Sequence, residues 1–258
     1  MLKQVTLTRN GNSFVVELSR PDRLNALGLE MWRELAEAIE GIVKTPDIRC
    51  VILRGAEGNF AAGADIAEFA RERNSPAAAA RYGKEIDRAL RAIRDCPLPT
   101  IAAVEGVCIG GGLQIAIACD LRIGGTSGRY GAPVGKIGVV MPFPEVAYLV
   151  EVVGHAVALE ILLEGRVFDA GEAVAKGLIG RAIDDAKVME EAIAMARRIE
   201  QGAPLSHRYH KKLVRRCLDP QPLTEEDYAE GFAVCASEDY AEGIRAFLEK
   251  RKPVFKGK

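Results

Sequence analysis

The sequence has almost no excess of charge. It contains 35 lysine and arginine residues against 36 aspartate and glutamate residues, for a net charge of −1. Binding to nucleic acid requires a basic surface that neutralises phosphates. The bulk charge therefore gives no support for a nucleic-acid partner.

Long apolar runs are also lacking. No segment reaches the roughly 20 apolar residues that cross a bilayer, and the N-terminal stretch "MLKQVTLTRNGNSFVV" has no apolar run typical of a targeting segment. We therefore expect a cytoplasmic protein without a membrane partner, unless a targeting segment was cleaved from it. The apolar fraction of 48% is enough for a sizeable core, in one domain or in a domain with an appendage.

Cysteine and histidine form no obvious functional cluster. The six cysteines include no CxxC pair, and several lie in apolar runs, so we predict buried free thiols. His207 and His210 are three residues apart in the cationic stretch "SHRYHKKLVRR", which supplies no third ligand. A solvated helix face is favoured over a metal site, and no local signature of a Ser-His-Asp or Cys-His nucleophile is present.

The hydrophobic pattern predicts an α/β core followed by helices. Met31, Leu35, Ile39 and Ile42 form one apolar stripe, which indicates a helix. β-Branched and apolar runs predict strands on both sides of it and further along the chain, at 14–19, 50–56, 99–106 and 120–125. After residue 146 helical patterns dominate, interrupted by a short strand in "GLIGRAI". We divide the chain into a core at 1–195 and a helical region at 196–258.

One structural unit occurs twice. Residues 50–69, "CVILRGAEGNFAAGADIAEF", and residues 100–119, "TIAAVEGVCIGGGLQIAIAC", both predict a strand, a turn of small residues and a helix. The first turn of a helix leaves backbone N–H groups without internal partners. Two such turns facing one point form an oxyanion hole, which requires two donors aimed at a developing negative charge.

A simpler explanation of the triple glycine is close packing against a neighbouring element. The stretch "GVCIGGGLQ" lacks the GxGxxG spacing of a dinucleotide site. The repetition of the same strand-turn-helix context favours a functional interpretation over packing alone.

These paired turns resemble those of the crotonase superfamily, the enoyl-CoA hydratase/isomerase family. The segments "RPDRLNALG", "LEGRVFDAGEAVAKGLIGRAI" and "GIRAFLEKRKPVFK" extend the resemblance over nearly the whole chain. It implies a crotonase-like spiral of ββα units with a C-terminal helical trimerisation region. It also implies binding of an acyl-CoA thioester, coenzyme A being part of the substrate, with no permanently bound cofactor and no metal. A homotrimer or a dimer of trimers is expected.

The resemblance assigns roles to individual residues. The backbone N–H groups of Ala64 and Gly111 correspond to the oxyanion donors. Phe247 and Lys250 match residues that reach the CoA of a neighbouring subunit in some members. The remaining expected substrate and CoA contacts are Arg23, Leu24, Ala26, Ala62, Asp65, Ile66 and Gly110. Asp65 also has a simpler interpretation, as the cap of the helix that follows it.

The chain departs from the hydratase pattern at both catalytic glutamates. Gln114 and Val134 occupy the two positions. Hydration needs a base for water and an acid for carbon, and neither side chain transfers a proton at neutral pH. Glu145 is the nearest acidic candidate, although a favourable charge at a helix N-terminus is a sufficient explanation for it.

Three functions remain open from the sequence. The first is a reaction that makes a thioester enolate without the usual glutamates, such as decarboxylation of a malonyl-type thioester. The second is a hydratase or isomerase that uses another acid such as Glu145. The third, of a different class, is a non-catalytic acyl-CoA-binding protein.

Overall fold

The predicted strands lie side by side in one sheet. In the computed structural model, which describes residues 3–258, this sheet has six strands in the order β1-β2-β3-β4-β6-β9. β1 and β2 are antiparallel, and the other neighbouring strands are parallel. A second sheet has the order β5-β7-β8. The strands are β1 (Val5–Asn10), β2 (Ser13–Leu18), β3 (Cys50–Gly55), β4 (Thr100–Val104), β5 (Val107–Ile109), β6 (Leu121–Gly125), β7 (Arg129–Gly131), β8 (Phe168–Asp169) and β9 (Ala182–Ile183).

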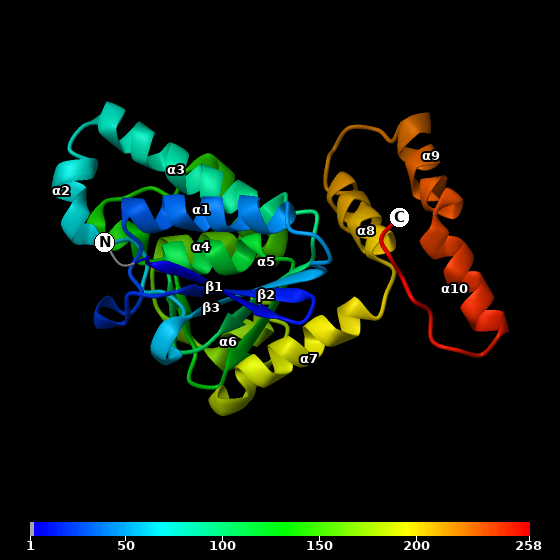
Figure 1. Cartoon of the computed structure of the whole chain (residues 1–258). Helices are drawn as coiled ribbons and strands as arrows, with labels where there is room; N and C mark the ends of the chain where they lie inside the picture. Colours follow the sequence, from blue (N-terminus) through cyan, green and yellow to red (C-terminus); the bar gives the residue numbers. More distant parts are fainter. Residues whose placement is uncertain (1–2) are drawn as a thin grey trace.

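Helices cover both faces of the larger sheet (Figure 1). Side chains alternate between the faces of a strand, and β3 uses both faces. Val51 and Leu53 belong to the core shared with α1, α3 and α4, whereas Cys50 and Ile52 pack against α7. The helices are α1 (Leu29–Val43), α2 (Phe69–Glu72), α3 (Pro76–Arg94), α4 (Gly111–Ala118), α5 (Phe143–Glu164), α6 (Ala170–Ala175), α7 (Val188–Glu200), α8 (Pro204–Arg216), α9 (Glu225–Ala233) and α10 (Glu238–Leu248).

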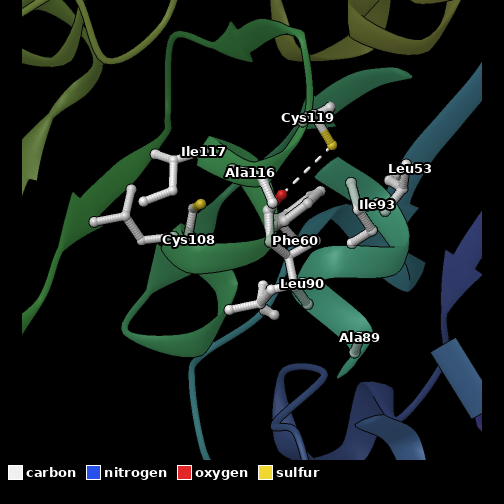
Figure 2. Packing of buried hydrophobic residues seen from close by; sticks show 14 of the residues in the cluster. Leu53, Phe60, Ala89, Leu90, Ile93, Cys108, Ala116, Ile117 and Cys119 are labelled. Carbon is white, nitrogen blue, oxygen red and sulfur yellow. Dashed lines mark hydrogen bonds between the residues drawn. The ribbon is translucent and has the colours of Figure 1, made fainter. Parts of the chain in front are cut away.

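The short helix α4 is buried along its whole length. Figure 2 shows Leu53, Phe60 and Ile93 packed around its C-terminal end, where Cys119 donates to the Ile115 carbonyl at 3.4 Å. Four of the cysteines are buried free thiols, as predicted, and Cys217 and Cys235 are exposed. A helix enclosed on all sides is held rigidly, which fixes the position of its N-terminus.

Among the described residues, one helix, α5, is both long and rich in apolar residues. Its 22 residues are apolar enough, by length and composition alone, to cross a membrane. The helix is interrupted at Gly154, where φ is 75°. Glu145, Leu149, Ala158 and Ile161 are buried on its inner face, and α4 lies beside it. Burial within the described chain is therefore confined to one side of α5.

The C-terminal helices α8, α9 and α10 lie to one side of the sheet and its covering helices (Figure 1). The expected division after residue 195 falls inside α7, which packs against β3, β4 and β6. Thr224 and Asp227 form the capping box that begins α9. The helix α3 was not predicted, although Ser75 caps it and Ile86, Leu90 and Ile93 give it an apolar stripe.

Candidate active site

The first of the two turns is held by backbone pairing with the segment before α1. Leu27 donates to the Gly63 carbonyl at 2.7 Å, and Asp65 donates to the Leu27 carbonyl at 2.9 Å. Because successive amides of an extended segment point in opposite directions, the intervening N–H of Ala64 points away from Leu27. Within residues 3–258 this N–H has no hydrogen-bond acceptor.

The second turn is the N-terminus of α4. Gly111 is the first residue of the helix, so its N–H lacks an intrahelical partner, and no other described residue accepts from it. The Gly111 nitrogen lies 3.6 Å from the position that a Cβ atom on Gly63 would take. The two turns are therefore adjacent, and Ala64 and Gly111 line the same cavity.

Glycine is required here for two separate reasons. Gly63 and Gly110 have φ values of 98° and 52°, in the region that disfavours side chains. At Gly112 a Cβ atom would lie 2.3 Å from the Ala61 carbonyl oxygen. The close-packing explanation of the triple glycine therefore holds for Gly112, while Gly110 and Gly63 shape the turns.

The cavity has a volume of about 370 Å³ and is mostly apolar. Its walls come from both turns, from α3, from the start of α5 and from the segment between β7 and α5. The residues from the sequence analysis that line it are Ala62, Ala64, Ile66, Gly110, Gly111, Gln114, Val134 and Glu145. Several further lining residues were not predicted, which are Trp32, Phe69, Arg73, Ala79, Gly83 and Ile86.

A carboxyl group is buried beside Gln114. The Gln114 amide donates to Glu145 Oε2, and the two side chains belong to residues that are only 7% and 4% exposed. Gln114 follows Gly111 by nearly one helical turn, so both belong to the same end of α4. Glu145 does lie in the first turn of α5, as a helix N-terminal charge would, yet it also faces the cavity.

The surroundings of Glu145 change its proton affinity. Burial raises the pKa of its carboxyl to about 7, while the positive charge of Arg73 and the hydrogen bond from Gln114 oppose the shift. The negative charge of Asp87 on α3 raises the pKa of Glu145 further. A carboxyl group with a pKa near neutrality can both accept and return a proton at physiological pH.

Asp65 braces the first turn from behind. Its carboxylate lies 2.8 Å from an Arg20 nitrogen and 3.6 Å from an Arg23 nitrogen, and it accepts from the Ala67 amide. Arg20 also donates to the Ala26 carbonyl at 2.7 Å. The hydrogen bond from Arg20 holds the pKa of Asp65 below its usual value. The helix-cap interpretation of Asp65 is confirmed, and the "RPDRLNALG" segment supports the turn.

Several of the expected CoA contacts lie outside the cavity of their own chain. Leu24 and the side chain of Arg23 are about half exposed beside the first turn. Phe247 is 81% exposed at the end of α10, on the opposite side of the molecule from α2 (Figure 1). Lys250 follows it with a φ of 55°. Phe247 and Lys250 do not contribute to this cavity within one chain.

His207 and His210 do not belong to a group of side chains that could bind a metal ion in the described part of the chain. The His207 ring nitrogen lies 2.9 Å from the Ile199 carbonyl oxygen. Among residues 3–258 no group of three potential metal ligands occurs.

Two adjacent turns, one paired with Leu27 in an isolated β-bridge and one at the N-terminus of α4, lie beside a buried acid. Such a site can polarise a carbonyl group and move a proton. The family model described as "Enoyl-CoA hydratase/isomerase" matches residues 8–258. The chain therefore belongs to the enoyl-CoA hydratase/isomerase family, within the crotonase superfamily, whose members act on CoA thioesters. Its architecture is the crotonase fold.

Individual relatives agree with this assignment. The enoyl-CoA hydratase EchA19 of Mycobacterium tuberculosis is 34% identical over 97% of this chain and 95% of its own. The short-chain-enoyl-CoA hydratase of Clostridium acetobutylicum is 32% identical over 97% of each. The crystal structure of an enoyl-CoA hydratase/carnithine racemase from Magnetospirillum magneticum is 47% identical and superimposes with a TM-score of 0.97, covering 100% of this chain and 97% of its own.

Proposed function

We propose that the protein is an enzyme that shifts the double bond of an enoyl-CoA thioester, with Glu145 as the one proton-transfer group. The observation that carries this proposal is the buried carboxyl of Glu145, which faces the same cavity as the amides of Ala64 and Gly111. A double-bond shift needs one group that removes a proton and returns it elsewhere, whereas hydration also needs an activated water.

The reaction proceeds through an enolate. The Glu145 carboxylate removes a proton from C2 of a 3-enoyl thioester, and the electron pair of the C–H bond moves into the thioester carbonyl. The Ala64 and Gly111 N–H groups stabilise the enolate oxygen, because fixed donors in a dry pocket offset its charge. Glu145 then returns the proton to C4, which leaves the double bond between C2 and C3.

Gln114 is a positioning residue in this scheme. Its amide donates to Glu145 Oε2 and so holds the carboxyl on the α4 side of the cavity. The hydrogen bond also favours the charged form of the carboxyl. Val134 supplies an apolar wall where a hydratase has its second glutamate, so water is not activated there.

The assembly and the cellular location complete the proposal. The protein forms a trimer or a dimer of trimers through its C-terminal helices, in which Phe247 and Lys250 approach the CoA of a neighbouring subunit. It works in the cytoplasm without a permanently bound cofactor.

Calorimetric titration with a saturated acyl-CoA tests the binding half of the proposal. We expect saturable binding, because the paired turns and the apolar cavity accept a thioester that cannot react further. Free acetate at the same concentration is the control and should give no heat of binding. No saturation with any CoA thioester would contradict an acyl-CoA function of either a catalytic or a non-catalytic kind.

A further inference from the structure

Among residues 3–258, Arg73 has no acidic side chain within ion-pair distance, although it lies on the wall of a mostly apolar cavity. It follows α2 and lines the cavity together with Phe69 and Glu145. Within residues 3–258 its side chain forms no ion pair and no hydrogen bond with another residue. By contrast, Arg71 on the same short helix pairs with Glu72 at 2.7 Å and is largely exposed.

Aromatic rings fix the direction of the Arg73 side chain. The guanidinium carbon lies 4.4 Å from the centre of the Phe69 ring and 5.6 Å from that of Tyr82. The two rings pack edge to face with their centres 6.1 Å apart. Cation–π contacts of this kind hold a guanidinium in place but leave its N–H groups free to donate in the plane.

Arg73 lines the same cavity as Glu145. Its charge opposes the raised pKa of Glu145, the group that the proposed function places beside the reacting carbons. The other lining cation, Lys136, is exposed, and its Cε atom lies 3.7 Å from the place of a Cβ atom on Gly165, beyond the end of α5. Arg73 is therefore the cation that a bound acyl chain approaches.

An entirely apolar acyl chain would displace water from this guanidinium and would offer its N–H groups no hydrogen-bond acceptor. Leaving a charged donor unpaired in a desolvated site is costly, whereas a carboxylate accepts two parallel hydrogen bonds from the guanidinium fork. We infer that the substrate is a dicarboxylic acyl-CoA thioester, whose distal carboxylate binds Arg73. This inference rests on the proposed acyl-CoA function and names its substrate class.

The test compares two thioesters of equal chain length, hexanoyl-CoA and adipyl-CoA, by calorimetry on the full chain. Both are saturated, so binding is measured without turnover. We expect adipyl-CoA to bind about tenfold to a hundredfold more tightly, as one charge-assisted pair gives. In Arg73→Met this preference should disappear, while hexanoyl-CoA binds as before or slightly more tightly. Arg73→Lys should keep part of the preference.

The matched control is Arg71→Met, which removes an exposed arginine from the same helix and should leave both affinities unchanged. Equal binding of the two thioesters by the unmodified protein would overturn the inference while the acyl-CoA function stands. An equal loss for hexanoyl-CoA, adipyl-CoA and free CoA in Arg73→Met would also overturn it, because Arg73 would then bind a CoA phosphate. Binding of neither thioester by the unmodified protein would overturn both the inference and the proposed function.

Discussion

Replacing Glu145 by glutamine is expected to lower the rate of double-bond isomerisation by about 10²–10⁴, the contribution of one general acid–base group. The substituted amide keeps the size of the side chain and an oxygen that accepts from Gln114, but it cannot take up a proton. The measurement is the appearance of conjugated thioester absorbance from 3-hexenoyl-CoA. A rate within threefold of the unmodified protein would exclude Glu145 as the base.

The stability of the same variant distinguishes lost chemistry from lost folding. The pKa of Glu145 is about 7 in the folded chain, above the ordinary value of 4.5. The folded state therefore binds the proton more tightly, so its stability falls as pH rises from 4.5 to 7. Glutamine avoids this cost. Urea unfolding should show the variant up to about 3 kcal/mol more stable at pH 8 and no different at pH 4. Lower stability at pH 8 would indicate damaged folding.

Hydration of crotonyl-CoA by the unmodified protein should be several powers of ten slower than by an ordinary hydratase. Gln114 and Val134 cannot transfer protons, and general acid–base groups contribute about 10²–10⁴ each, without simple additivity. The measurement is the loss of conjugated thioester absorbance. Rapid hydration would show that another group activates water in this cavity.

Placing glutamates at positions 114 and 134 should raise the hydration rate. The contact between Gln114 and Glu145 makes a third substitution necessary. Gln114 contacts Glu145, so Gln114→Glu alone would place two carboxyl groups in contact and raise the pKa of one of them. The variant Gln114→Glu, Val134→Glu, Glu145→Gln leaves one carboxyl at each hydratase position. This triple variant should hydrate crotonyl-CoA faster than the double variant Gln114→Glu, Val134→Glu. A faster double variant would contradict the contact between positions 114 and 145.

Local patterns were enough to predict the turns but not the burial of Glu145 in the cavity. Ala64 and Gly111 lie in stretches whose small residues and strand-turn-helix order are visible in the sequence, and the structure places both amides on one cavity. The contact of Gln114 with Glu145 joins residues 31 positions apart. Before folding, Glu145 is only an acid near a helix start, and burial in a cavity is a property of the tertiary structure.

The environment of Arg73 was even less predictable from local sequence patterns. No motif marks it, and the sequence surrounds it with charges that would be expected to pair with it. Its side chain packs on the rings of Phe69 and Tyr82 rather than pairing with an acid among residues 3–258, and this packing depends on α3, which was not predicted. The boundary drawn after residue 195 falls inside α7, and the packing of this helix against the sheet is a property of the tertiary structure.

Hydrogen exchange at C2 of a saturated thioester tests the central claim most directly, because it needs only the enolate and the base. Hexanoyl-CoA and adipyl-CoA in D₂O, followed by proton NMR, should lose their C2 proton signals when the unmodified protein is added. With Glu145→Gln, the C2 proton signals should be lost only as slowly as they are without protein. No exchange with the unmodified protein, or equal exchange with the variant, would contradict an enolate formed by Glu145.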